Sequence, residues 1–452
     1  MSTPLTRDLA AFVATLSFDA LPAEAVATAK LAFLDATGVM LAGKDEPCVT
    51  VLINTLEPSA GDASLFCGPQ RVRAPEAAWI NAVATHALDF DDTALSAHPS
   101  AVMVPAIVAE GEHLGSSGRD MICAYVAGFE VWAEIKRREA GQHHLKGWHP
   151  TGIIGAIAAA AACAYLRRLD VDQVVNALAL GASQSAGITA NFGTMAKPFH
   201  AGRAAHAGVL AARLAQNGMT ASSDALEHAQ GFLTAVSPSG QVDRVSPCEV
   251  GKNWASASIG LHIKKYPTCY CSHRPIDAML SLREMHPEFA PDDVEEIVVS
   301  MSRRNAMVLR NARPKTGLEA KFSIEFVLSC ALIVGRVGLS ELDNAVVLRK
   351  DIQAMMERVR TVYDPCEDPS SGYAPFDQVA VVLRDGRTIE SEPVALARGA
   401  AGAPLSDEEV RSKFLDCTSR TLDETTALGL YVRLKRLDTL DRIGAAFVEA
   451  DE

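Results

Sequence analysis

The chain has 452 residues, of which 48% are hydrophobic and 21% are charged. This length predicts two or three domains, and the apolar fraction can fill a sizeable core, which excludes a mainly disordered protein. The 42 Lys and Arg residues are outnumbered by 55 Asp and Glu residues, and the resulting net charge of -13 argues against nucleic acid or an anionic membrane as the main partner.

Three sequence features predict a cytoplasmic protein with reduced thiols. The longest apolar run, residues 152–166, is shorter than the roughly 20 residues that a membrane-spanning helix needs. The N-terminal sequence MSTPLTRDLAAF lacks the long apolar stretch of a signal peptide. The ten cysteines are scattered and do not form the pattern of a small disulfide-stabilised domain.

Up to about Lys264 the hydrophobic pattern is almost entirely helical. Apolar residues three to four positions apart predict helices over residues 25–41, 75–88, 121–135 and 171–186. Small residues on several faces of these segments allow helices to approach closely, so we expect a dense helical bundle.

After Pro267 the pattern changes to a mixture of strands and helices. Strands are predicted over residues 294–301, 378–383 and 388–392, the last two joined by the hairpin signal Asp385-Gly386. Helices are predicted over residues 324–334, 339–345 and 351–360. This mixture predicts a small α+β domain over residues 267–395.

From Ser406 onward the pattern is helical again, and Ser406-Asp407-Glu408-Glu409 is a favourable helix start. We predict that this segment returns to the first bundle; a small separate unit is the alternative. The predicted architecture is mainly α. A discontinuous all-helical large domain, residues 1–266 and 396–452, carries the smaller α+β domain as an insertion.

Common cofactor and nucleophile motifs are absent from the sequence. There is no G-x-G-x-x-G after a strand, no G-x-x-x-x-G-K-[ST], no H-E-x-x-H and no G-x-S-x-G. Cys269 and Cys271 are too closely spaced for the usual zinc knuckle, and no second pair follows at a matching distance. We therefore do not expect a dinucleotide, nucleotide or structural zinc site.

The first candidate site is HALDFDDT, residues 86–93, followed by His98-Pro99-Ser100. On a helix, Asp89, Asp92 and Thr93 would share one face, and acids at a helix C-terminus oppose the helix dipole. A catalytic role is one interpretation, and a solvated acidic turn with a capping role is another. A metal site is a weaker third, because no second cluster of ligands accompanies the acids.

The second candidate is GWHPTG, residues 147–152. Pro150 fits the first helical position, which makes His149 the N-cap. There the positive helix end favours the neutral imidazole of a base near pH 7. A histidine that only closes the helix end is the alternative.

The third candidate is NFGTMAKPFHAG, residues 191–202. Lys197 precedes a proline, so we expect it on an extended turn, with His200 at the start of the next helix, where anions are favoured. A purely structural loop is the alternative.

The fourth candidate, residues 264–275, holds Lys264, Tyr270, His273 and Arg274 at the predicted domain boundary, where small-molecule sites are common. A hinge with incidental charge is the alternative. Together the four runs predict a cationic, imidazole-lined cleft with one or more carboxylates. Such a cleft suits a substrate with two or three carboxylates that loses a proton beside one of them.

These motifs resemble the MmgE/PrpD family, which includes 2-methylcitrate dehydratase, cis-aconitate decarboxylase and iminodisuccinate epimerase. The resemblance rests on HALDFDDT with HPS, GWHPTGIIG, NFGTMAKPFHAGRAAHAG, K-x-Y-P with S-H-R-P, and EAKFSIEF, and it extends to KFLDCTSR. It implies an all-helical domain, a smaller α+β domain, a homodimer, and no cofactor or metal. The implied site residues are Asp89, Thr93, His98, His149, Lys197 and Lys264, with His200, Tyr270 and His273 as neighbours.

Two departures from the family pattern bear on the reaction. Decarboxylase-like members resemble this region with a Tyr at the position of Phe326, which argues against that activity. Many dehydratase-like members have CCRYTHPAID where this chain has TCYCSHRPID, so Tyr270 occupies the position of an Arg. The local motifs are most similar to those of the iminodisuccinate epimerase branch.

The resulting hypothesis is a cofactor-independent enzyme that removes a proton α to a carboxylate of a di- or tricarboxylic acid. The outcome is dehydration, decarboxylation or epimerisation. Lys197 and Lys264 would bind carboxylates, and His98 and His149 would form the acid–base pair, in either order.

Asp89 would orient a histidine or act as a base, and Thr93 would donate a hydrogen bond. The residues expected to contact substrate further are His200, Tyr270, His273 and Arg274. The rival hypotheses are a non-catalytic polycarboxylate-binding member of the family, a structural helical scaffold and a metal-dependent hydratase.

Overall fold

A computed structural model describes residues 4–66, 69–139, 142–364, 366 and 373–444. The fold is mainly α with a smaller α+β part, as the sequence predicts. The chain forms two compact units. The helical unit comprises Met1–Ala87, Asp91–His262 and Asp407–Glu452, and the α+β unit comprises Leu88–Phe90 and Ile263–Ser406.

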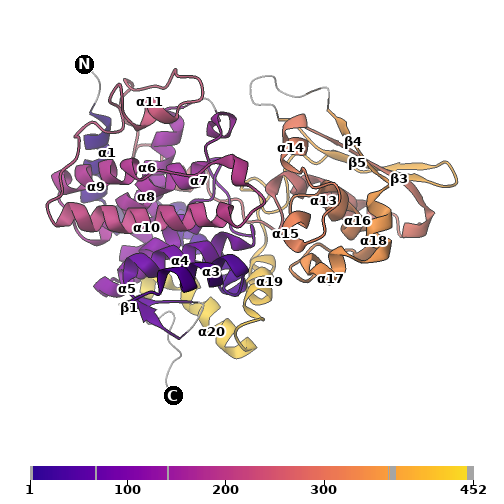
Figure 1. The fold of residues 1–452 in the computed structure, drawn as a ribbon, viewed down its shortest axis with the longest axis horizontal. Coiled ribbons are helices and arrows are strands. Elements are labelled where there is room, and N and C mark those ends of the chain that lie inside the picture. Colours follow the sequence, from indigo (N-terminus) through magenta and orange to yellow (C-terminus); the bar gives the residue numbers. More distant parts are fainter. Residues whose placement is uncertain (1–3, 67–68, 140–141, 365, 367–372, 445–452) are drawn as a thin grey trace. The chain divides into compact units, whose positions relative to one another are not determined.

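The helical unit contains most of the long helices (Figure 1). Its regular elements are α1 Leu5–Thr15, α2 Ala23–Gly43, α3 Pro47–Leu56, β1 Ala60–Ser64, β2 Arg71–Val72, α4 Ala74–Ala87, α5 Pro99–Leu114, α6 Gly118–Arg137, α7 Pro150–Ile153, α8 Gly155–Leu166, α9 Val171–Ser183, α10 Ala196–Gln216, α11 Phe232–Val236, α12 Ala255–Ser258, α19 Asp407–Thr418 and α20 Glu424–Lys435. The prediction of an almost entirely helical N-terminal part is wrong in two places. Strands β1 and β2 form a small antiparallel pair, and residues 217–254 are mostly irregular.

Small residues set the spacing of the helices around α10, as the alanine-rich pattern predicts. Helix α10 packs along α4 and α8 (Figure 1). A Cβ atom at Gly208 would lie 2.3 Å from the Cβ of Ala159 on α8, and one at Gly202 would lie 2.7 Å from the carbonyl oxygen of Trp79 on α4. Since such distances are far inside van der Waals contact, larger residues at either position would force the helices apart.

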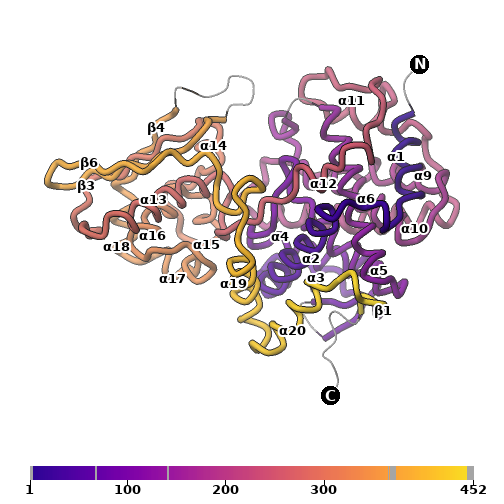
Figure 2. The backbone as a smooth tube through the Cα atoms, turned by 180° about the vertical axis from the view of Figure 1, so that it is seen from behind, coloured from indigo at the N-terminus to yellow at the C-terminus, as the bar shows by residue number. Residues whose placement is uncertain are grey.

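Helix α2 is a core helix of this unit. It has 21 residues and a mean hydropathy of 1.5 over its most apolar stretch, which is long and apolar enough to cross a membrane. However, 67% of that stretch is buried, and the helix packs against α4 and α19. Figure 2 shows the C-terminal α19 beside this N-terminal helix. The last helices thus pack on the first bundle, within the helical unit.

The α+β unit is built on a four-stranded sheet of order β4-β3-β5-β6. Its elements are α13 His273–Met285, β3 Val294–Met301, α14 Arg303–Val308, α15 Gly317–Ala320, α16 Ile324–Val334, α17 Asn344–Val347, α18 Lys350–Met356, β4 Val359–Tyr363, β5 Gln378–Leu383 and β6 Thr388–Glu390. Strands β3, β5 and β6 and helix α16 confirm the sequence predictions. The helix predicted over residues 351–360 is too long, because α18 ends at Met356 and the chain enters β4, which pairs in parallel with β3. The helix predicted over residues 339–345 is a 3-10 turn followed by α17.

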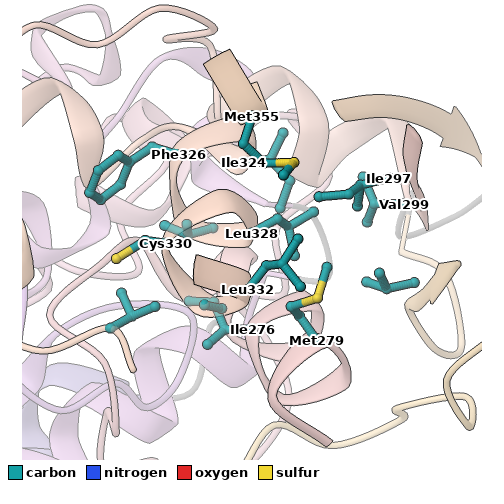
Figure 3. Close-up of a cluster of buried hydrophobic side chains, with 14 of the residues drawn as sticks. Ile276, Met279, Ile297, Val299, Ile324, Phe326, Leu328, Cys330, Leu332 and Met355 are labelled. Atoms are coloured by element: carbon teal, nitrogen blue, oxygen red, sulfur yellow. The ribbon is translucent and has the colours of Figure 1, made fainter. Parts of the chain in front are cut away.

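The core of this unit lies between the sheet and its helices (Figure 3). Alternate residues of β3, among them Ile297 and Val299, are fully buried, which is the pattern of a strand with one face on the core. They face Leu328 and Leu332 of α16. Phe326 on the same helix is also fully buried and belongs to this core.

Candidate functional site

The acidic run after α4 is not helical, so the prediction that Asp89, Asp92 and Thr93 share a helix face is wrong. Helix α4 ends at Ala87, and Asp89 adopts a left-handed φ of 52°, which stops the helix. Thr93 then pairs through its backbone with His262, with N···O distances of 2.9 and 2.8 Å in the two directions. The turn places Asp91 back against His86, on the last turn of α4.

One buried carboxylate, Asp91, holds two imidazoles. Its oxygens lie 3.0 Å from Nδ1 of His86 and 2.9 Å from Nδ1 of His98. His98 is the N-cap of α5, with Pro99 at the first helical position, and its backbone N–H donates to Thr151 Oγ1 at 3.2 Å. The rings of His86 and His98 are 4.5 Å apart. The fold thus brings the last turn of α4 and the start of α5 together on Asp91.

The hydrogen bonds of Asp91 determine the tautomer of both histidines. Nδ1 of His98 also lies 3.0 Å from the carbonyl oxygen of Asp92, so it must carry the proton to satisfy two acceptors. The two imidazoles hold the pKa of Asp91 well below its usual range, although burial opposes this shift. Burial lowers the pKa of His86 to about 4, and Nε2 of His86 is buried without a hydrogen-bond partner.

A second pair of imidazoles lies beside the first. His149 is the N-cap of α7 with Pro150 at its first position, which confirms that prediction. Its Nδ1 lies 3.1 Å from Nδ1 of His200, and its ring is stacked 5.9 Å from that of His86. The pKa of His149 is well below its usual range, as the prediction of a neutral imidazole requires. Burial is the main cause, followed by the neighbouring imidazoles and Lys197.

We call His86, His98, His149, His200 and Asp91 the histidine cluster. Lys197 lies near it, with Nζ 5.4 Å from the ring centre of Phe192, whose ring in turn meets the edge of His149 at 4.8 Å. Lys197 is buried, and its charge contributes to the lowered pKa values of three of the imidazoles.

The predicted backbone setting of Lys197 and His200 is wrong. Both lie on α10, which begins at Ala196, rather than on an extended turn and at a helix start. Pro198 is tolerated because it falls in the first helical turn, where no intrahelical N–H is needed. Lys197 and His200 are three residues apart, so they share one side of the helix.

The helical unit has two further buried acids here, Asp92, which belongs to the first candidate run, and Asp35, which the sequence interpretation did not consider. Asp35 on α2 contacts Nζ of Lys413 on α19 at 2.6 Å. Burial and the nearby Asp35 carboxyl raise the pKa of Asp92 well above its usual range, which favours its protonated form. The sequence predicts one or more carboxylates beside the cations and imidazoles, and Asp35, Asp91 and Asp92 are the acids found in this part of the helical unit.

In the α+β unit, Asp89 and Lys264 form a buried pair. Nζ of Lys264 lies 3.0 Å from Oδ1 of Asp89 and donates to its carbonyl oxygen at 2.7 Å. The side chain of Lys264 is 1% exposed, and the backbone of Ile263 is tied to Gly399 by an N–H···O bond of 2.8 Å. Lys264 thus binds both the side chain and the backbone of Asp89, the residue that adopts the strained φ.

The remaining predicted residues of this unit separate into two groups. The rings of Tyr270 and His273 lie 5.0 Å apart, and Nε2 of His273 lies 3.3 Å from the carbonyl oxygen of Thr268. Arg274 instead makes a bidentate pair with Asp377, at 2.9 and 3.0 Å, and its remaining donors reach backbone carbonyls. The predicted role of Arg274 in substrate binding is therefore at odds with its contacts, which are those of a structural residue.

Within the described part of the chain, a metal ion has one set of candidate ligands in the helical unit. Ligand atoms of His86, Asp91 and His98 lie within 4.8 Å of one another. Two imidazoles and one carboxylate suit a divalent transition metal. In this arrangement, however, the same atoms already satisfy one another by hydrogen bonds.

His86 and Asp91 are the main residues that sequence reasoning did not assign to the site, although both stand inside HALDFDDT. Their spacing of five residues carries no helical signal. The left-handed turn at Asp89 brings the two residues together. The only sequence signal for this turn was the presence of an Asp directly after a predicted helix.

Comparisons with known proteins agree with the motifs. Residues 7–245 match the MmgE/PrpD N-terminal domain and residues 266–433 match the MmgE/PrpD C-terminal domain. Cis-aconitate decarboxylase of Homo sapiens is 28% identical over 398 residues, which cover 85% of this chain and 81% of that protein. The cis-aconitate decarboxylase of Mus musculus is 27% identical over 396 residues, covering 85% and 80%. The cis-aconitate decarboxylase-like protein oryM of Aspergillus oryzae is 27% identical over 452 residues, covering 93% and 92%.

Proposed function

The chain belongs to the MmgE/PrpD family, and on this premise we propose that it is an acid–base enzyme that acts on a di- or tricarboxylic acid as a lyase. The observation that carries the proposal is the histidine cluster, in which four imidazoles and an ionised carboxylate are gathered beside Lys197. Imidazoles are the most common general acids and bases in enzymes, and a buried cation stabilises a carboxylate substrate. The names of the curated relatives favour decarboxylation of cis-aconitate as the first reaction to test.

In the proposed reaction, Lys197 binds one substrate carboxylate and holds the reacting carbon near the imidazoles. The bond to a second carboxylate breaks, its electron pair ends in a new C–H bond, and CO2 leaves. His98 or His149 supplies the proton for that bond. Asp91 accepts a hydrogen bond from Nδ1 of His98 and so fixes the tautomer of that ring.

Epimerisation is the second candidate function, and it is favoured by the local motifs of residues 191–202 and 269–275. Two imidazoles in different settings suit this reaction. His98 is held by Asp91 and His149 by His200, so one can remove the α proton while the other returns a proton to the opposite face. Phe326, the position that argued against decarboxylation, is fully buried in the core of the α+β unit, so its identity is a weak guide to the reaction.

An NMR activity screen over cis-aconitate, citrate, methylcitrate and iminodisuccinate in D2O tests the proposal. We expect either loss of CO2 with deuterium at carbon or loss of water to an alkene, and the His149→Gln variant should abolish the reaction while the melting temperature is retained. Inversion with deuterium incorporation and without alkene or CO2 would favour the epimerase. No reaction and no thermal stabilisation by any acid would contradict both. Unchanged rates after dialysis against a chelator would support the expected independence from a metal.

A further inference from the structure

The contact between His149 and His200 joins two imidazoles through their Nδ1 atoms at 3.1 Å. A hydrogen bond between two such nitrogens needs one proton, so one ring donates and the other accepts. His149 is 1% exposed and His200 is 7% exposed. His200 is thus the more accessible partner of the pair, and each ring keeps its Nε2 atom for another contact.

The position of the His200 ring is set by close backbone packing. Gly187 has a φ of 124°, and a Cβ atom there would lie 3.0 Å from Cγ and 3.2 Å from Nδ1 of His200. A Cβ atom at Gly152 would lie 3.4 Å from Cβ of His200. The same Gly187 accepts the backbone N–H of His149 at 3.0 Å. One glycine therefore fixes both rings, which makes the short Nδ1–Nδ1 contact a specified feature of the fold.

The sequence neighbours of this pair reach the surface. Ile188 follows Gly187 and is 47% exposed, and Phe199 precedes His200 and is 41% exposed. On the other side, His149 is stacked against His86, which has its own hydrogen bond to Asp91. Among the described residues of the helical unit, His200 is thus the imidazole that is hydrogen-bonded to His149, and it is more exposed to solvent than His149 is.

We propose that His200 relays protons between the buried His149 and the solvent, an inference that rests on the proposed function. When His149 gives a proton to the substrate from Nε2, its Nδ1 accepts the proton from Nδ1 of His200, and Nε2 of His200 takes a proton from water or buffer. The reverse order serves proton removal. The transfer between the two rings moves one proton along the observed Nδ1–Nδ1 hydrogen bond, and no electron transfer or co-reactant is needed. It leaves His149 protonated on Nδ1 and His200 protonated on Nε2, so both rings return to the starting tautomer before the next turnover.

Decarboxylation replaces a carboxylate group by hydrogen, so it consumes one proton in every turnover. His149 is buried, so it has little direct contact with bulk water from which to regain that proton. A partner imidazole in direct hydrogen bond removes this limit. The relay thus explains why two histidines, rather than one histidine and a fixed acceptor, meet at this point.

The test is the turnover of His200→Ala and His200→Gln at low and high imidazole concentration, measured on the substrate found in the screen. We expect kcat to fall by roughly 10²-fold, the lower bound for an acid–base group, while kcat/KM changes much less. Added imidazole should restore kcat of His200→Ala in a saturable manner. His206→Ala is the matched control, because His206 lies on the same helix and also has a pKa lowered to about 4 by burial.

Each outcome decides the inference. An unchanged kcat in His200→Gln, or a raised KM without rescue by imidazole, would overturn the relay and leave the proposed function standing. Lack of turnover by the wild-type protein on any polycarboxylate would instead overturn the proposed function itself. If His200→Ala fails to fold, the Gln variant and a scalar coupling between the two Nδ1 atoms in the ¹⁵N-histidine-labelled wild type provide the answer; absence of the coupling would contradict the relay.

Discussion

The histidine cluster of the helical unit and the Arg274–Asp377 pair of the α+β unit are both buried polar groups, but they are satisfied to different degrees. All three guanidinium nitrogens of Arg274 donate to protein acceptors, and each carboxylate oxygen of Asp377 accepts one of these hydrogen bonds. In the cluster, Nδ1 atoms are bonded to Asp91 or to each other, while Nε2 of His86 has no protein partner. A saturated network stabilises a fold, whereas a network with an open nitrogen, such as Nε2 of His86, can accept a ligand.

The sharpest test of this comparison is Asp91→Asn. The amide has the same shape but must present an N–H to one of the two imidazoles, which disturbs the tautomers of His86 and His98. We expect kcat/KM to fall by about 10²- to 10⁴-fold, the usual contribution of an acid–base system. Steady-state kinetics measures the loss, and circular dichroism checks the fold. A loss of less than tenfold would show that Asp91 does not orient the catalytic groups.

The opposite result is expected at the saturated pair. Arg274→Met leaves Asp377 buried without its partner, so the free energy of unfolding should fall by about 3–5 kcal/mol, the usual penalty for breaking a buried ion pair. Denaturant unfolding measures this change. The double variant Arg274→Met with Asp377→Leu is the matched control and should recover much of the loss. If Arg274→Met instead raised KM at full stability, Arg274 would be a substrate ligand, as the sequence predicted.

These two regions also show what the sequence could and could not reveal. Strong periodicity located α16 and β3, and the Asp385-Gly386 signal located the hairpin of β5 and β6. Strand β4 was missed because its identity depends on parallel pairing with β3, about 60 residues earlier in the chain, and not on its own pattern.

At the site, a local rule predicted His149 as an N-cap because Pro150 follows it directly. The same kind of rule failed for Lys197. A proline after Lys197 is compatible with an extended turn and equally with the first turn of a helix, and the chain adopts the helix. The pairs Arg274–Asp377 and Asp35–Lys413 join residues that are far apart in sequence, so only the tertiary fold reveals them.

The pH dependence of stability extends the comparison to the neutral imidazoles. Burial lowers the pKa of His200 to about 4, against about 6.5 in the unfolded chain, so between these values the unfolded state binds a proton that the folded state excludes. The free energy of unfolding should therefore decrease as the pH falls from about 6.5 to 4, by at most about 3 kcal/mol for this residue. His200→Gln should flatten that slope. An unchanged slope in His200→Gln would show that His200 is protonated in the folded protein.

The smallest expected effect separates two adjacent acids. Burial and Asp35 raise the pKa of Asp92 well above its usual range, which favours the protonated form, while the imidazoles favour the ionised form of Asp91. An Asn side chain has the shape of a neutral Asp and can replace it without changing the charge. Asp92→Asn should therefore keep kcat/KM and the free energy of unfolding within the limits of an ordinary conservative change, about 1 kcal/mol. A large loss of activity, comparable to that of Asp91→Asn, would show that Asp92 is ionised and that the site contains two anionic carboxylates, which would weaken its fit to a polycarboxylate substrate.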